Sequence, residues 1–155
     1  MSTALPQSAS YDSSVADRVA RLNVMLKRQL GAYAKEHFDL TIIETRLMLM
    51  LAMSASPTVN DLAGRSDIDR TQISRSISVL ARRRLLTRSA GAKDRRQAAL
   101  KLTRKGVAVH RRILEELYTR NQSLIGGLPA QKLAGFFEVM DILIARARAQ
   151  LDHHE

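Results

Sequence analysis

The chain of 155 residues has no cysteine and no tryptophan, and only 4% of it is aromatic. Without cysteine, neither thiol redox sensing nor a thiolate metal site is available. The scarcity of aromatic residues argues against a stacking platform for single-stranded nucleic acid. The absence of thiols also fits a reducing compartment, so we expect a cytoplasmic protein.

Segments that would direct the chain into or across a membrane are also missing. No apolar run approaches the roughly 18 residues that a membrane span needs. The start, MSTALPQSASYDSS, lacks the basic and apolar regions of a signal peptide. With three prolines and seven glycines, extended disorder is expected only over residues 1–10, with one domain over residues 11–155.

Negative charge is scarce in one part of the chain. Residues 65–111 hold 14 Lys or Arg but only three Asp, whereas the remainder is close to neutral, and the net charge is +10. Such segregation favours a polyanionic partner, because each neutralised phosphate releases counterions. The alternative is a solvated basic face that serves solubility.

Apolar periodicity and capping residues predict mostly helices. One helix runs from Tyr11 to about residue 36, and the capping box Thr41/Glu44 opens a buried helix, IIETRLMLMLAM. Thr58 caps VNDLAGR, and Asp69 with Gln72 forms a second capping box. Two short helices joined by a tight turn make a helix-turn-helix.

A hairpin and two long helices follow. Residues 85–88 and 97–102 are predicted strands, Thr103 caps a long helix, and Gly126-Gly127-Leu128-Pro129 separates it from the last one. The fold class is therefore mainly α: a winged helix-turn-helix, α-α-α-α-β-β-α-α. The DNA-binding lobe spans about 41–102, and the helices of about 11–36 and 104–151 form a homodimer, because one helix reads too few bases to find one genomic site.

The helix after Asp69 is predicted to read double-stranded DNA. Its inward stripe leaves a polar face outward, and its N-terminal part would lie deepest in the major groove. Side-chain chemistry favours base contacts for Arg75, Gln72 and Thr71 and phosphate contacts for Arg70 and Ser74. An exposed face of an ordinary helix is the alternative. The basic run of residues 82–84 closes the helix. Cations there would stabilise the negative end of the helix dipole, and a phosphate contact is the equal alternative.

The hairpin tip is the second candidate contact. Asp94 and Arg96 lie two residues apart, so on an extended segment the carboxylate can hold the guanidinium for a narrow minor groove. Arg95 points elsewhere and is expected to meet phosphate. A solvated tip is the alternative.

These pieces resemble the multiple-antibiotic-resistance regulator (MarR) family, through DLAGRSDIDRTQISRSISVLARRRLLTRS and KDRRQAALKLTRKG with helices on both sides. The resemblance covers about residues 12–151. It implies a homodimer built from the terminal helices, Arg96 as the minor-groove arginine supported by Asp94, and a role in response to stress. One departure is Arg84, where relatives usually carry glycine.

The resemblance also implies release from DNA by a small molecule, often a phenolic or other aromatic acid. Tyr33, His37 and Arg46 are the candidate effector contacts, and Arg46 could pair with a carboxylate. The alternatives are an ordinary ion pair for Arg46 and a surface position for His37. No metal, cofactor or catalytic arrangement is expected.

We therefore predict a sequence-specific transcriptional regulator, a dimeric repressor of a palindromic operator. The main alternative is a non-specific architectural DNA- or RNA-binding protein, which the basic charge alone does not exclude. A third reading, an enzyme-like small-molecule binder, would need perturbed titratable groups around a pocket.

Overall fold

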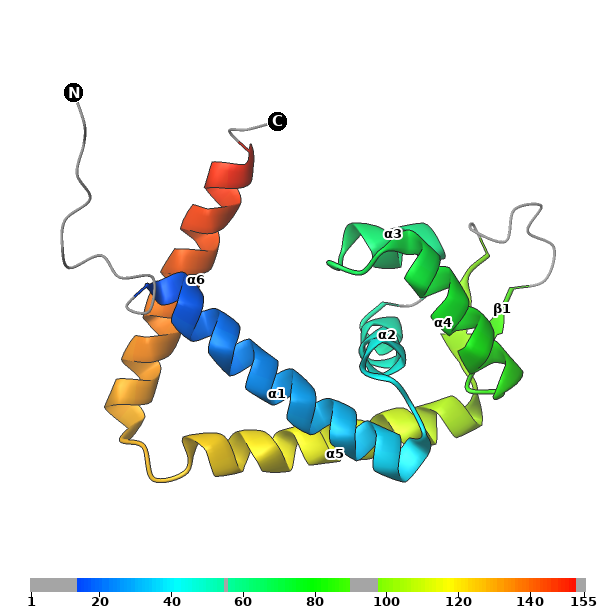
Figure 1. Ribbon diagram of the computed structural model, residues 1–155, viewed down its shortest axis with the longest axis horizontal. Helices are drawn as coiled ribbons and strands as arrows, with labels where there is room; N and C mark the ends of the chain where they lie inside the picture. Colours follow the sequence, from blue (N-terminus) through cyan, green and yellow to red (C-terminus); the bar gives the residue numbers. More distant parts are fainter. Residues whose placement is uncertain (1–13, 55, 90–97, 153–155) are drawn as a thin grey trace. The chain divides into compact units, whose positions relative to one another are not determined.

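The computed structural model describes residues 14–54, 56–89 and 98–152 (Figure 1). The expected disorder of residues 1–10 lies outside this range, as does the hairpin tip. Six helices and two strands follow in the order α1 Val15–Phe38, α2 Ile42–Ala52, α3 Val59–Gly64, α4 Arg70–Arg82, β1 Leu86–Arg88, β2 Leu100–Leu102, α5 Arg104–Ile125 and α6 Ala130–Asp152. This is the predicted order of elements.

Capping side chains explain where the helices begin. The predicted box at α2 is present: the Thr41 N–H donates to Glu44 (2.8 Å) and the Glu44 N–H donates to the Thr41 hydroxyl (3.2 Å). A second complete box opens α3, between Thr58 and Asp61. At α4 the prediction was half right, because Gln72 contributes only its backbone N–H to the Asp69 carboxylate.

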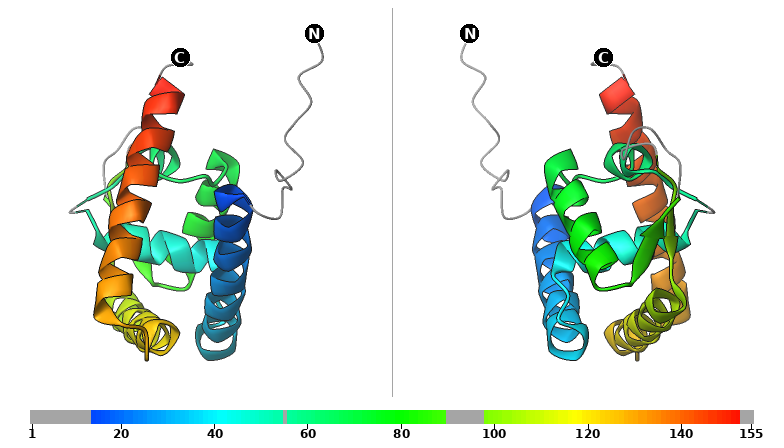
Figure 2. Two further views of the ribbon diagram at one scale, coloured as in Figure 1. Left: turned by 90° about the vertical axis from the view of Figure 1, so that its left-hand side faces the viewer. Right: turned by 90° about the vertical axis from the view of Figure 1, so that its right-hand side faces the viewer.

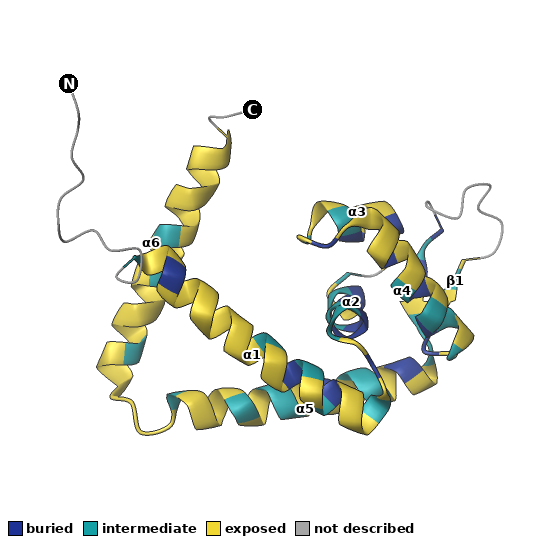
Figure 3. Ribbon diagram, viewed as in Figure 1, coloured by how far each residue is buried: buried dark blue, intermediate teal, exposed yellow. Residues whose placement is uncertain are grey.

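Helix α2 lies at the centre of the lobe that α2, α3, α4 and the two strands form. It contacts α1, α4 and β2, and Figures 1 and 2 show it in the middle of this part of the chain. Leu47, Met48 and Leu51 are buried, as the nearly uniform apolar sequence predicted. Figure 3 shows buried residues on α2 and α4 and, more sparsely, on α1 and α5.

The two strands form an antiparallel pair. Leu86 lies opposite Leu102, Thr87 opposite Lys101, and Arg88 opposite Leu100. The two leucines Leu86 and Leu100 are almost completely buried. The pair therefore packs one face on the lobe and leaves Thr87 and Lys101 exposed.

The described residues divide into two compact units, one up to Glu115 and one from Glu116 onward. The second unit contains the end of α5 and all of α6, joined by a turn in which Gly127 has φ 77°. No residue of α6 is buried, although Phe136, Phe137, Val139, Ile142 and Ile144 are large and apolar. None of the described helices combines the length and the apolarity that a bilayer crossing requires.

Candidate nucleic-acid interface

Helix α4 presents a polar face to solvent because its apolar residues are spaced to face the lobe. Ile73, Ile77 and Leu80 are completely buried. The predicted DNA contacts on this helix are all exposed, namely Arg70, Thr71, Gln72, Ser74 and Arg75. The structure thus brings these five side chains together on one open surface.

The N-terminal end of α4 is held by Asp69. Its carboxylate accepts from the N–H groups of Thr71 (2.8 Å) and Gln72 (3.2 Å). These bonds, that from Gln72 foremost, lower the pKa of Asp69, so it stays ionised at neutral pH. The cap fixes the first turn, which carries Arg70, Thr71 and Gln72.

Helix α4 is also tied to the strand pair. Arg88 on β1 donates from Nη2 to the Ser78 hydroxyl (3.2 Å), and that hydroxyl donates to the Ser74 carbonyl (2.9 Å). Sequence reasoning missed Arg88, because nothing in the local pattern shows which side chain of a strand reaches a neighbouring helix. The contact joins β1 to the exposed face of α4.

The three arginines that follow α4 have three different environments. Arg82 is the last helical residue and is exposed. Arg83 donates to the carbonyls of Asp39 and Phe38 at the end of α1. Arg84 has φ 57°, the left-handed conformation that glycine adopts most easily. The helix therefore ends as it would with glycine, although the chain carries Arg84.

The predicted tip residues Asp94, Arg95 and Arg96 lie outside the described residues. On the strand sides of the tip, Ser89 and Ala99 are paired, since the Ser89 N–H donates to the Ala99 carbonyl (2.8 Å). The Ala99 N–H returns a bond to the Ser89 hydroxyl (3.0 Å). The pairing thus extends one residue beyond the strands toward the tip.

Residues 38–97 match the sequence model of the MarR family. A crystal structure of a MarR/EmrR family transcriptional regulator from Acinetobacter sp. ADP1 matches 94% of this chain and 99% of its own, with a TM-score of 0.75 and 17% identity. A MarR family transcriptional regulator from Silicibacter pomeroyi matches 91% of this chain and 95% of its own, with a TM-score of 0.75 and 22% identity.

A third structure is the complex of MepR from S. aureus with DNA. It matches 89% of this chain and 99% of its own, with a TM-score of 0.72 and 18% identity. None of the curated proteins matches the chain in sequence.

The chain has the MarR-family fold. The predicted resemblance is confirmed, and so is the mainly helical winged-helix class. The family match ends at residue 97, while the structural matches extend over the long terminal helices.

In this MarR-family fold, Thr103 and Gly106 join the strand pair to α5. The Thr103 hydroxyl donates to the Arg84 carbonyl (2.7 Å) and accepts from the Gly106 N–H (3.0 Å), which confirms Thr103 as the predicted cap of α5. A Cβ at Gly106 would stand 1.9 Å from the Leu85 carbonyl oxygen, so no other residue fits without a shift of backbone. The LTRKG motif contained this glycine, but only the structure shows what it packs against.

The predicted effector residues do not form one cluster of free polar groups. Arg46 pairs with Asp67 (2.5 Å), and this hydrogen bond is the main reason that the pKa of Asp67 is lowered. The His37 ring stacks on Tyr33, with centroids 4.2 Å apart, and its Nδ1 lies 3.0 Å from the Tyr33 carbonyl oxygen. Arg46 thus already has a carboxylate partner.

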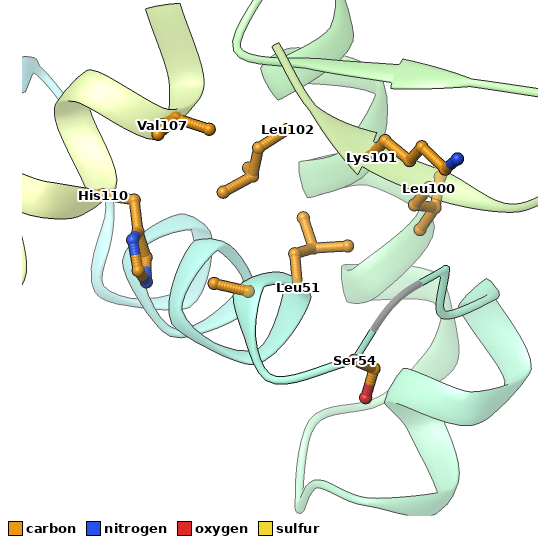
Figure 4. A pocket seen from close by; sticks show the side chains of 8 residues that line it. Leu51, Ser54, Leu100, Lys101, Leu102, Val107 and His110 are labelled. Carbon is orange, nitrogen blue, oxygen red and sulfur yellow. The ribbon is translucent and has the colours of Figure 1, made fainter. Parts of the chain in front are cut away.

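A cavity of about 320 Å³ opens elsewhere on the lobe, between the end of α2, β2 and the start of α5 (Figure 4). Its walls are mostly aliphatic, with Lys101 and His110 as the ionisable groups. Burial lowers the pKa of His110, which therefore favours the neutral ring. Among the described residues, no group of three or more His, Asp or Glu is placed to hold a metal ion.

Proposed function

We propose that this MarR-family chain is a sequence-specific regulator of transcription that binds double-stranded DNA as a homodimer in the cytoplasm. The observation that carries the proposal is the exposed polar face of the capped helix α4, next to an antiparallel strand pair in the basic part of the chain. The DNA complex of MepR, a chain of the same fold, supports it.

The chemistry of the exposed face assigns roles to its residues. Arg75 can form two hydrogen bonds with guanine and Gln72 two with adenine, and Thr71 lies beside them. Arg70 and Ser74 flank this set and would contact phosphates. The Ser74 carbonyl is occupied by Ser78, but the Ser74 side chain is exposed.

The hairpin tip would supply the second contact. Sequence and family resemblance assign Arg96 to the minor groove, with Asp94 as its support, and Arg95 to phosphate. A narrow minor groove concentrates negative potential, which favours an inserted arginine. The bond between Arg88 and Ser78 would keep the base of this hairpin at a fixed position beside the reading helix.

Exposed apolar side chains on the long helices support a dimer. A large apolar surface on a soluble protein marks an interaction site, and an identical second copy gives two reading helices for one site. These side chains include Val15, Val19, Leu22, Met25 and Leu26 on α1, Leu114 and Tyr118 on α5, and Phe136, Phe137, Val139, Ile142 and Ile144 on α6. We expect a palindromic operator with half-sites about 34 Å apart.

Repression and relief by a small aromatic or phenolic effector complete the proposal. A ligand that binds one arrangement of the dimer better than another shifts the population, and the affinity for DNA follows. Tyr33, His37 and Arg46 remain the proposed contacts, in which case an acidic ligand would compete with Asp67 for Arg46.

The deciding experiment captures genomic fragments on the purified full-length protein and sequences them, with and without aromatic carboxylic acids. A palindromic consensus supports the regulator, and loss of bound fragments with one acid identifies the effector class. An even spread over the genome would favour the architectural alternative. Binding of RNA fragments in a parallel arm would favour its RNA-binding form.

A further inference from the structure

The end of α1 and the end of α4 are joined by a single side chain. Arg83, the residue after α4, donates from Nη1 to the Asp39 carbonyl and from Nη2 to the Phe38 carbonyl, both at 2.5 Å. The residues are more than 40 positions apart in sequence. Arg83 is half-buried, in contrast to its exposed neighbour Arg82.

The contact is favourable because of where α1 ends. The last carbonyls of a helix have no partner within the helix, and they form the negative end of its dipole. Asp39 ends α1 in the left-handed conformation, with its N–H donating back to Ala34 and Lys35. The planar guanidinium of Arg83 satisfies two of the remaining carbonyls at once, which a lysine ammonium does less well.

Helix α5 is attached to the same place. The guanidinium of Arg112 lies over the Phe38 ring, 4.9 Å from its centroid. Lys105, in the first turn of α5, donates to the Arg83 carbonyl (3.4 Å). The reading helix, α1 and α5 thus meet at Arg83 and Phe38.

We propose that Arg83 is a positioning residue for DNA recognition: it fixes α4 relative to α1 and so sets the separation of the two reading helices in the dimer. This inference rests on the proposed function, which places α1 in the dimer interface and α4 in the major groove. The charge of Arg83 is engaged by the carbonyls of α1, so its contribution to binding is geometric and not a phosphate contact.

The test compares Arg83→Gln with Arg82→Gln, which removes the same charge from the adjacent exposed position. Each protein is titrated with the consensus operator and with operators lengthened by one or two base pairs between the half-sites. Each added pair moves a half-site by about 3.4 Å and turns it by about 35°. The wild-type protein should discriminate strongly against the longer operators.

Arg83→Gln should lose on the order of tenfold in affinity for the consensus operator. It should lose much less for the longer ones, so that the preference for one spacing shrinks severalfold. Arg82→Gln should weaken all operators by one common factor and keep the preference. A wild-type spacing preference in Arg83→Gln would overturn the proposal, because a merely structural or phosphate-binding arginine leaves that ratio unchanged.

A second variant covers the case in which Arg83→Gln does not fold. Arg83→Lys keeps the charge but cannot bond both carbonyls in the same way, and we expect an intermediate spacing preference. A Lys variant identical to the wild type would contradict the need for a guanidinium.

A measurement on the free protein separates this inference from the proposed function. Since the chain has no cysteine, Ser74→Cys provides one spin-label site on each protomer's α4. The label–label distance distribution should broaden in Arg83→Gln and stay narrow in Arg82→Gln; an equally narrow distribution in both would refute the positioning role. If the wild type bound all duplexes alike while the broadening was seen, the proposed function would fail and the positioning of α4 by Arg83 would stand.

Discussion

Replacing Arg84 by glycine should stabilise the protein. Arg84 has φ 57°, and a left-handed conformation costs an L-residue about 1–2 kcal/mol. Glycine avoids this cost, but its greater conformational freedom in the unfolded chain lowers the free energy of unfolding by about 0.4–1 kcal/mol. The Arg84 side chain is exposed, and the hydrogen bond from Thr103 goes to the Arg84 backbone carbonyl, so the glycine variant retains that bond. The net gain is about 0.5–1 kcal/mol, or about 1–4 °C in Tm for a chain of this size.

The assay is urea and thermal unfolding at one fixed protomer concentration, because the stability of a dimer depends on concentration. Arg84→Ala is the control, since it removes the same charge and side chain but keeps the Cβ. It should stay within about 0.5 kcal/mol of the wild type. If Arg84→Gly proved no more stable than Arg84→Ala, the left-handed conformation would not be the cost that we infer.

Three further predictions follow from the interface and the caps. Gly106→Ala should destabilise by more than about 3 kcal/mol, because its Cβ would meet the Leu85 carbonyl; a Tm near the wild-type value would disprove the close contact. Arg75→Ala should cost about 1–3 kcal/mol for the cognate duplex but little for a scrambled one, whereas Arg82→Ala should weaken both equally in gel shifts; equal losses for Arg75→Ala would remove it as a base reader. Stability should fall as the pH drops below about 4, because several carboxyl groups have a folded pKa below their unfolded value, so that the unfolded chain takes up protons first. These groups are Asp39, Asp61, Asp67 and Asp69. Urea midpoints from pH 5 to pH 3 measure the effect, and Asp69→Asn, which keeps a capping oxygen, should show a smaller decline; an unchanged decline would exclude Asp69 as a contributor.

The sequence predicted the local features of the fold well because caps and periodicity are local. Thr41 and Thr103 mark helix starts through hydroxyl groups that act within three residues, and both were recognised. The first helix was expected from Tyr11, but α1 begins at Val15, because the Ser14 hydroxyl caps it by accepting from the Asp17 N–H (3.1 Å). The spacing of Ser14 and Asp17 indicates this boundary, but the expected helix was started at Tyr11, ahead of the first apolar residues of its stripe.

Contacts between distant segments were not predictable in the same way. The exposure of Arg75 and Gln72 followed from the buried stripe on their own helix, but the partner of Arg83 lies on a helix that ends at residue 38. The sequence does not distinguish the three adjacent arginines, whereas the fold does: α4 ends at Arg82, Arg83 bonds to the end of α1, and Arg84 adopts the left-handed conformation. For Arg46 the ion pair was anticipated as an alternative, yet Asp67 as its partner required the fold.

Gly106 has a mechanical consequence for the hairpin. At Gly106 the backbone of α5 packs directly against the backbone at Leu85, the residue before β1, with no side chain between them. A displacement of the start of α5 would therefore also displace β1, because the two backbones cannot slide past each other. We expect a tilt of α5 to change the position of the strand pair.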